Sequence, residues 1–290
     1  MKIGMQIPHF KPSTPETMRG WLTDTVQAAD QGGFDSLWLM DHFFQLGGWL
    51  GAPETEMLEG YAALGFFAGI TQRMKLGLLV GGVIYRHPAL VVKSVSTLDV
   101  LSGGRMYFGI GASWYEHETK SLGMRFPPTK ERFEMLEETL QIATKMWAGD
   151  TSPYEGKHFQ LPYAVNCPQP LTKPHPPILI GGMGPKKTMR LIATYGDACN
   201  FFGRVEPALL QQRLDDLKRL CEKSGRPYEA IEKTALMTAD LETDGTKEVI
   251  KTGKAMEVLG FEHLMYNIKP SYTPETLRQF TQEIIPGLKG

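Results

Sequence analysis

Cysteine is scarce in this chain of 290 residues, which contains only Cys167, Cys199 and Cys221. Three cysteines do not form an even set for disulfides, and their spacing matches no common metal-binding pattern. We therefore expect neither a disulfide framework nor a metal centre, and free thiols are typical of a reducing cytoplasm. The fold must then rest on an ordinary hydrophobic core, for which a hydrophobic content of 42% is sufficient.

An excess of charge is also missing, because 31 Lys and Arg residues face 32 Asp and Glu residues, for a net charge of -1. A balanced surface gives no electrostatic attraction for nucleic acid or an anionic membrane. The longest apolar run, around Leu76–Tyr85, is too short to span a bilayer. The chain begins with a strand-like segment and no signal-peptide pattern. We therefore expect a cytoplasmic protein whose partner is a small-molecule substrate.

What the chain does contain is a regular alternation of strand-like and helix-like segments. Strands are predicted over residues 2–8, 36–40, 75–80, 105–110, 178–180, 197–202, 234–239 and 263–267, and each is followed by a segment with helical spacing. Strict alternation favours a parallel sheet, and eight repeats favour a closed (β/α)8 barrel, the TIM-barrel fold. We predict one α/β barrel domain over residues 1–290, with insertion loops near 42–61 and 149–177.

A doubly wound open sheet is the alternative α/β architecture. It usually carries a glycine-rich dinucleotide loop directly after the first strand. The segment Met5–Phe10 has no such loop, so the sequence favours the barrel.

The second predicted strand, Ser36–Met40, is followed by two ionisable residues, Asp41 and His42. In a parallel barrel, the carboxyl ends of the strands carry the catalytic groups. An imidazole exchanges protons near neutral pH, so His42 is a candidate general acid or base. The alternatives are that Asp41 only caps a turn and that His42 only positions other groups.

Three glycine-rich segments follow the third, fourth and fifth predicted strands. They contain Val80, Gly81 and Gly82; Gly111, Ala112 and Ser113; and Gly181, Gly182, Met183, Gly184 and Pro185. Missing side chains let a ligand approach the backbone closely. The last segment enters a predicted helix, whose free N–H groups would face an anion such as phosphate. For each segment, a glycine turn without a ligand is the alternative.

The loop after His42 is long and apolar, and it contains Phe43, Trp49 and Leu50. Loops of that length are typical of lids or binding loops, although such a loop can also pack on its own barrel. Together with Trp114, which follows the fourth strand, these side chains predict a fairly apolar substrate pocket.

Several segments resemble signatures of the bacterial luciferase-like monooxygenase superfamily. They are Leu37–Phe43, Tyr85–Leu90 with Leu98–Arg105, Phe108–Glu118, and Ile180–Gly182 with Gly196–Asp197. The resemblance covers most of the chain and implies a single (β/α)8 barrel that binds a flavin or deazaflavin. The pair Asp41 and His42 is more similar to the branch that uses the deazaflavin coenzyme F420 as a hydride carrier. The alternatives are an FMN-dependent monooxygenase, which uses O2 and flavin reduced by a partner reductase, and a non-catalytic cofactor-binding barrel.

The same resemblance implies roles for the candidate residues. Asp41 would hydrogen-bond the edge of the cofactor ring, and Val80 to Gly82 would form a bulge behind it, often with a non-prolyl cis peptide. Gly111 to Ser113 would contact the ring and ribityl chain, and Gly181 to Pro185 the phosphate. His42 with Asp41 would then form the catalytic pair, acting on a small organic substrate without a metal. A homodimer is compatible with these roles.

Overall fold

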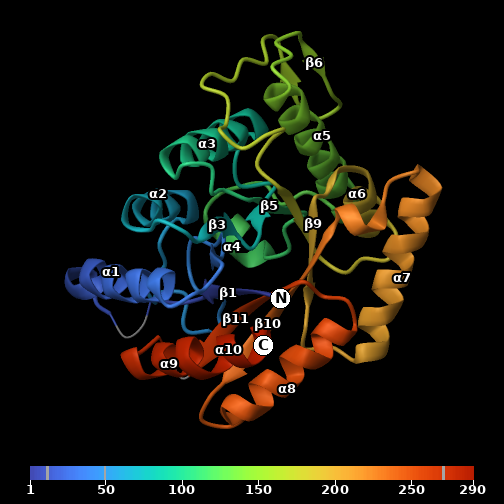
Figure 1. Cartoon of the computed structure of the whole chain (residues 1–290). Coiled ribbons are helices and arrows are strands. Elements are labelled where there is room, and N and C mark those ends of the chain that lie inside the picture. Colours follow the sequence, from blue (N-terminus) through green and yellow to red (C-terminus); the bar gives the residue numbers. More distant parts are fainter. Residues whose placement is uncertain (11–12, 49, 270–271) are drawn as a thin grey trace.

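The computed structural model of the protein describes residues 1–10, 13–48, 50–269 and 272–290. Over these residues the chain forms one sheet of nine parallel strands and a separate two-stranded hairpin (Figure 1). The strands of the large sheet are β1 (Lys2–Ile7), β2 (Ser36–Leu39), β3 (Lys75–Leu78), β4 (Gly81–Gly82), β5 (Phe108–Gly111), β8 (Ile178–Gly181), β9 (Ala198–Phe202), β10 (Glu232–Asp240) and β11 (His263–Lys269). Their positions agree with the prediction, with two exceptions. β5 begins at Phe108 rather than Arg105, and the strand predicted over residues 75–80 ends at Leu78 and is followed by the short strand β4, which was not predicted.

The large sheet closes on itself. Its strand order is β3-β2-β1-β11-β10-β9-β8-β5-β4, and the two end strands are consecutive halves of one interrupted strand. A parallel bridge between Leu76 and Met106 joins β3 to the segment that leads into β5, which completes the ring. With β3 and β4 counted together, the described residues form eight strand positions. The predicted (β/α)8 TIM-barrel fold is confirmed, and the open doubly wound sheet is wrong for this chain.

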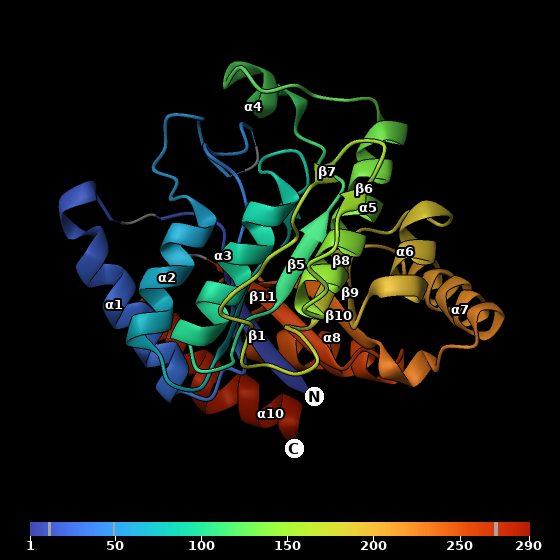
Figure 2. The same cartoon turned by 90° about the horizontal axis from the view of Figure 1, so that it is seen from above.

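Helices cover the outside of the barrel (Figure 1). They are α1 (Pro15–Gln31), α2 (Gly60–Ile70), α3 (Pro88–Leu101), α4 (Glu116–Ser121), α5 (Thr129–Trp147), α6 (Lys187–Tyr195), α7 (Pro207–Ser224), α8 (Gly245–Val258), α9 (Pro274–Gln279) and α10 (Ile285–Lys289), with a 3-10 segment η1 (Tyr228–Ala230) and a π-helical segment η2 (Phe280–Ile284). The sequence did not predict α4, which lies at the end of the barrel opposite to the two chain termini (Figure 2). Within the described ranges, no helix is long and apolar enough to cross a membrane.

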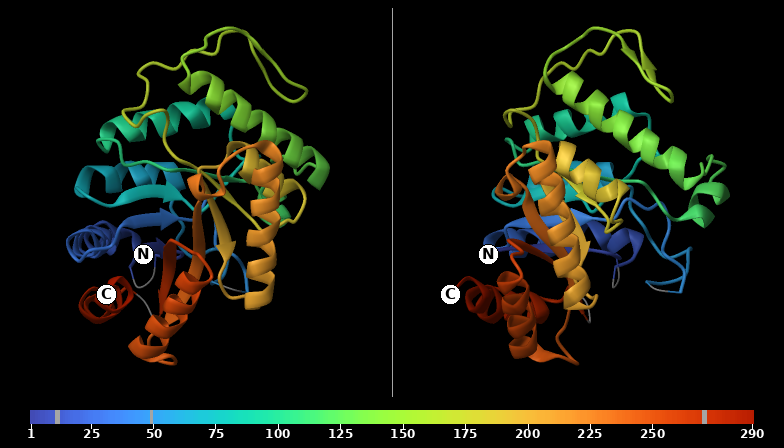
Figure 3. Two further views of the ribbon diagram at one scale, coloured as in Figure 1. Left: turned by 45° about the vertical axis from the view of Figure 1, so that its right-hand side comes forward. Right: turned by 90° about the vertical axis from the view of Figure 1, so that its right-hand side faces the viewer.

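The insertion near residues 149–177 lies outside the repeating β/α unit. It contains the hairpin of β6 (Tyr154–Glu155) and β7 (Gln160–Leu161) and runs over the outer side of α3 and α5 (Figure 3). The buried carboxylate of Glu138 on α5 accepts a hydrogen bond from the main-chain N–H of Lys157 at 2.9 Å. The insertion is therefore packed onto the barrel.

Side chains alternate between the inside and the outside of the barrel along each strand. On β2, Trp38 belongs to the cluster inside the barrel, whereas Leu37 and Leu39 pack outwards against the helices. The other buried members of the inner cluster are Leu79, Tyr107, Leu179, Ala198 and Met265. This alternation also decides which way the residues that follow each strand face.

Between β3 and β4 the chain comes very close to two neighbouring strands, because both carry glycine at the point of contact. The Leu79–Val80 peptide bond is cis. A Cβ at Gly111 would lie 2.9 Å from Cγ2 of Val80, and a Cβ at Gly181 would lie 2.8 Å from the same atom. The Val80 side chain therefore uses the space that these two glycines leave open.

We expect Gly109→Ala to destabilise the protein. A Cβ at Gly109 would lie 1.9 Å from the carbonyl oxygen of Leu78, a main-chain atom that cannot move without displacing β3. Overpacking of this kind costs about 1–3 kcal/mol of unfolding free energy, and occasionally more. The control is Gly20→Ala on α1, where no described atom lies within 4 Å of the added Cβ. The control should be neutral or slightly stabilising in urea unfolding, and equal losses in both variants would contradict the packing account.

Candidate active site

The three glycine-rich segments lie side by side at the carboxyl rim, the end of the barrel where the strands finish. β4 pairs with β5 and β5 pairs with β8, so that Gly82 stands opposite Gly111, and Ile110 opposite Ile180. Segments far apart in the sequence thus form one surface with few side chains. The Val80 side chain fills the space beside Gly111 and Gly181 and is part of this surface.

Asp41 and His42 are adjacent in sequence but face opposite sides of the barrel wall. Asp41 continues the outward phase of Leu37 and Leu39, and His42 continues the inward phase of Trp38. Asp41 is buried on the helix side of the strands, whereas His42 meets α4 at the open end of the barrel. The two residues therefore act as separate groups in separate surroundings.

The carboxylate of Asp41 is held by Arg86 and Gly82. Arg86 donates two parallel hydrogen bonds of 2.8 Å each, and the N–H of Gly82 donates a third of 2.9 Å. Arg86 also donates to Glu59, and its guanidinium lies 4.9 Å from the ring centroid of Tyr61. Burial lowers the pKa of Arg86, but Asp41 and Glu59 more than offset this and raise it overall. Asp41 thus fixes the end of β4 from the helix side of the barrel wall, and its hydrogen bond to a cofactor ring stays a prediction.

We expect Arg86→Met to reduce stability strongly, because the Asp41 side chain is 1% exposed and would lose its cation. Breaking a buried pair in this way costs about 3–5 kcal/mol of unfolding free energy. Arg190→Met is the matched control. Arg190 makes the same two-bond pair with Glu137, at 2.7 and 2.6 Å, but its side chain is 49% exposed. Exposed pairs contribute about 0–1 kcal/mol. Chemical unfolding of both variants is the measurement, and similar losses would disprove the role given to Arg86.

His42 is bound by Glu118 of α4. Its Nδ1 lies 3.0 Å from Oε2 of Glu118, and the hydroxyl of Tyr85 donates to the same oxygen at 2.6 Å. Oε1 accepts the main-chain N–H groups of Phe43 at 2.6 Å and Phe44 at 3.2 Å. Burial raises the pKa of Glu118, but the hydrogen bonds from His42 and Tyr85 outweigh it and lower the pKa overall. The carboxylate is therefore ionised at neutral pH.

Three residues of this arrangement were missed as functional residues by the sequence reasoning: Tyr85, Arg86 and Glu118. All three fall within the segments that carry the family resemblance. Nothing in their spacing distinguishes them from neighbouring polar residues, since each meets its partner only across the folded barrel. The family resemblance is the only feature of the sequence discussed above that could have identified Tyr85, Arg86 and Glu118.

The predicted substrate-pocket residues are distributed unevenly. The ring of Trp114 lies 5.9 Å from the ring of His42 in an edge-to-face contact, and Trp114 is 56% exposed. Phe43 instead points to the helix side of the barrel wall. Leu50 is partly buried in the loop after β2, and Trp49 lies outside the described residues. Of this set, the structure brings Trp114 to the imidazole.

The buried polar atoms near the carboxyl rim that have no hydrogen-bond partner among the described residues include Oγ of Ser113 and Oδ1 of Asn267. Ser113 follows β5 with a φ of 59°. Asn267 lies on β11 in the same inward phase as Met265 of the inner cluster. Buried polar groups are ordinarily paired, so these two atoms suit a polar ligand bound at the rim.

The predicted phosphate segment, Gly181–Pro185, leads into α6, which begins at Lys187. In the described structure no side chain caps this helix start, so its first N–H groups suit an anion. Gly182 has a φ of 121°, which favours glycine, and a Cβ at Gly184 would lie 2.8 Å from Oγ1 of Thr188. The backbone conformation of Gly182 and the close contact at Gly184 account for these two glycines even if no ligand binds there. The phosphate-binding role of the segment stays a prediction.

A second set of catalytic residue types lies at the opposite, amino end of the barrel. Oγ of Ser36 is 2.8 Å from Nε2 of His263, and Nδ1 of His263 is 3.5 Å from Oε1 of Glu232. The order is that of a Ser-His-acid triad, but Ser36 and His263 are sealed from solvent and Trp38 donates to the serine oxygen at 2.6 Å. Burial raises the pKa of Glu232, but His263 and Lys2 outweigh it and lower the pKa to about 2. This set is a buried polar network without access for a substrate.

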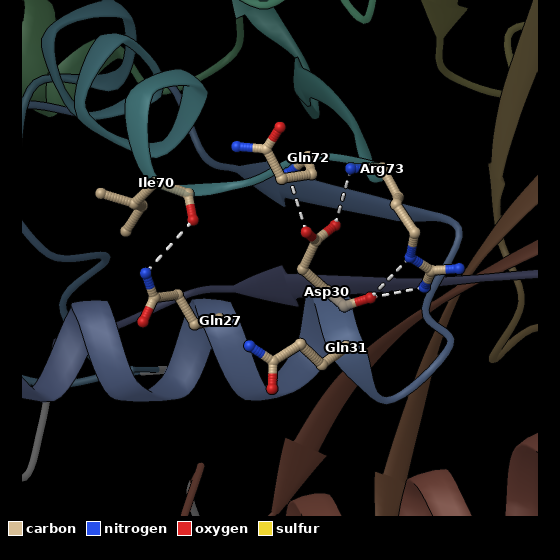
Figure 4. A pocket seen from close by; sticks show the side chains of 6 residues that line it. All are labelled: Gln27, Asp30, Gln31, Ile70, Gln72 and Arg73. Atoms are coloured by element: carbon tan, nitrogen blue, oxygen red, sulfur yellow. Dashed lines mark hydrogen bonds between the residues drawn. The ribbon is translucent and has the colours of Figure 1, made fainter.

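A surface hollow also lies near the amino end, between α1 and the turn before β3 (Figure 4). It is lined by Gln27, Asp30, Gln31, Ile70, Gln72 and Arg73. The carboxylate of Asp30 accepts the N–H groups of Gln72 at 2.8 Å and Arg73 at 3.1 Å. These bonds attach α1 to the turn. Since the amino face of such barrels serves stability rather than chemistry, the carboxyl rim is the candidate active site.

Comparison with known proteins identifies the family. Residues 1–244 match the family described as "Luciferase-like monooxygenase". The F420-dependent glucose-6-phosphate dehydrogenase of Microbacterium testaceum (strain StLB037) is 27% identical, over an alignment that covers 97% of this chain and 96% of that protein. The chain belongs to the luciferase-like monooxygenase family, and it is an oxidoreductase of that family.

Solved structures share the fold along the whole chain. An F420-dependent secondary alcohol dehydrogenase, in complex with an F420-acetone adduct, has a TM-score of 0.84 at 18% identity and covers 100% of this chain and 99% of its own. The oxygenating constituent of 3,6-diketocamphane monooxygenase from Pseudomonas putida, in complex with FMN, has a TM-score of 0.72 at 17% identity. The match covers 99% of this chain and 98% of that structure's chain. Because a structure with F420 and a structure with FMN share this barrel, the fold alone does not distinguish between the two cofactors.

Proposed function

We propose that this protein is a coenzyme F420-dependent oxidoreductase that transfers a hydride between the deazaflavin and a small, fairly apolar organic substrate. The observation that carries the proposal is the full-length similarity to an enzyme named for F420. The geometry supports it, because His42 reaches the carboxyl rim where the glycine-rich segments converge.

The residues at the rim fit a cofactor of this kind. The segments Val80–Gly82 and Gly111–Ser113 offer a surface with few side chains to a flat ring. The unpaired Oγ of Ser113 offers a polar contact to the ring or to the ribityl chain. The start of α6, after Gly181–Pro185, would hold the phosphate. Asp41 would contribute mainly by fixing Gly82 at the end of β4.

The deazaflavin supplies the hydride chemistry when it is bound. The protein's own contribution is position, exclusion of water and the movement of a proton. His42 is held at Nδ1 by Glu118, and within the described part of the chain no polar group contacts its Nε2. Nε2 is therefore the atom that would give a proton to the substrate or take one from it.

Exposed aromatic side chains at the rim support an apolar substrate. Trp114 stands beside His42, and Phe202, at the end of β9, is 60% exposed. Phe202 shares the inward phase of Ala198, so its ring projects from the barrel at the open end. A compact substrate with a hydrocarbon body suits these surfaces better than a phosphorylated sugar.

Cofactor choice is tested by titrating the cofactor-free protein separately with F420 and with FMN, following cofactor fluorescence. We expect F420 to bind below micromolar concentration and FMN to bind at least about tenfold more weakly, a difference of about 1.4 kcal/mol. Tighter binding of FMN would contradict the proposal and favour the oxygen-using monooxygenase. Tight binding of F420 without turnover on a broad substrate panel would favour the non-catalytic barrel.

His42→Ala should retain F420 affinity but reduce turnover by roughly 10²–10⁴-fold, the usual contribution of general acid–base catalysis. His117→Ala is the control, because it removes an exposed imidazole from the same helix that carries Glu118. Normal turnover of His42→Ala between pH 5 and 9 would remove the acid–base role and leave His42 as a packing residue.

A further inference from the structure

Glu118 is a fully buried carboxylate whose acceptor sites are all in use. Its four donors are His42 Nδ1, the Tyr85 hydroxyl, and the main-chain N–H groups of Phe43 and Phe44, at 2.6–3.2 Å. A carboxylate offers about four lone-pair positions. The side chain therefore joins the loop after β2 to the helix after β5, and it does so beside the imidazole at the carboxyl rim.

We propose that Glu118 is a positioning residue that fixes His42 in the tautomer with hydrogen on Nδ1 and so presents Nε2 as the proton acceptor. An ionised carboxylate can only accept hydrogen bonds, so Nδ1 of His42 must be the donor. In a neutral imidazole the other nitrogen then carries a lone pair. Glu118 thus decides which nitrogen of His42 is basic.

The other donors around Glu118 reinforce this choice. Burial raises the pKa of the Tyr85 hydroxyl, and the hydrogen bond to Glu118 raises it further, so the phenol keeps its proton and remains a donor. The N–H groups of Phe43 and Phe44 cannot act as acceptors. Every neighbour of the carboxylate is therefore a donor, and a protonated Glu118 would leave one donor without an acceptor. The surrounding donors favour the ionised form of Glu118. The ionised form in turn favours the His42 tautomer that carries hydrogen on Nδ1.

The orientation of the imidazole is fixed at the same time. Its ring centroid lies 5.9 Å from the ring centroids of both Trp114 and Tyr115, in edge-to-face contacts with the segment that leads into α4. Glu118 holds the main chain directly after His42 through two N–H groups. Rotation of the ring would break the bond to Glu118 and both aromatic contacts. The same contacts therefore fix both the tautomer of His42 and the orientation of its ring before any ligand binds.

Glu118→Gln is the informative substitution. A glutamine side chain has one oxygen acceptor and an NH2 group that only donates. It cannot accept four hydrogen bonds, and its NH2 group would face other donors. Glu116→Gln makes the same chemical change two residues earlier on α4, where the side chain is 55% exposed and pairs with Lys120 at 2.8 Å. It is the matched control.

The experiment is nitrogen-15 NMR of the cofactor-free protein with labelled histidines, recorded as a function of pH and interpreted in the alkaline limit, where the ring-nitrogen signals no longer change. Loss of one signal in His42→Ala assigns His42 among the seven histidines. We expect Nδ1 of His42 to carry the hydrogen in the native protein and in Glu116→Gln, and the Nε2-protonated tautomer to become populated in Glu118→Gln. Hydrogen on Nε2 in the native protein would overturn the proposal, as would an unchanged tautomer in Glu118→Gln.

If Glu118→Gln does not fold, the native spectrum and Tyr85→Phe still decide the question. Tyr85→Phe keeps the carboxylate and its bond to His42, so it should keep the native tautomer, and loss of that tautomer would count against Glu118. The proposal builds on the acid–base role of His42, but its readout involves neither cofactor nor turnover. Failure of F420 to bind, with the expected tautomer present, would therefore reject the proposed function alone.

Discussion

The packing of Val80 against Gly111 and Gly181 is the contact on which the rest of the site depends. A side chain at either glycine would meet Val80 at less than 3 Å, so the third strand can lean inwards only because its neighbours lack side chains. The strand consequently divides into β3, which pairs with β2, and β4, which pairs with β5. This division both completes the barrel and places Gly82 at the carboxyl rim, where its N–H reaches Asp41.

Two buried carboxylates then fix the two sides of the rim. Asp41 faces the helices and is neutralised by Arg86, a largely buried ion pair that connects the end of β2 to the start of α3. Glu118 faces the open end and has His42 as the group beside it that can become cationic. Alternation along β2 assigns the adjacent residues Asp41 and His42 to these different surroundings. One sequence pair thereby supplies a structural anchor on one face and, on the other, the imidazole that we propose handles the proton.

The sequence predicted the barrel and the meeting of the glycine-rich segments at its carboxyl rim, because both follow from local patterns. Eight alternating segments specify the fold, and glycines or ionisable residues after successive strands must meet at one edge of a parallel sheet. The partners of the ionisable residues could not be predicted in this way. Glu116 and Glu118 are equivalent in any local pattern, and α4 is a helix of six residues without a long apolar face. Likewise, the partner of Asp41 is Arg86, 45 positions along the chain, and the two meet only once β2 pairs with the following strand.

The carboxyl rim at β4, β5 and β8 is the place where we propose that a deazaflavin ring binds, with His42 beside it. A crystal structure of the protein with F420 bound tests this most directly. The account predicts the ring against Val80–Gly82, the phosphate at the start of α6, and Nε2 of His42 facing the reactive side of the ring. A ring bound elsewhere on the barrel, or bound at this rim with His42 turned away from it, would contradict the account.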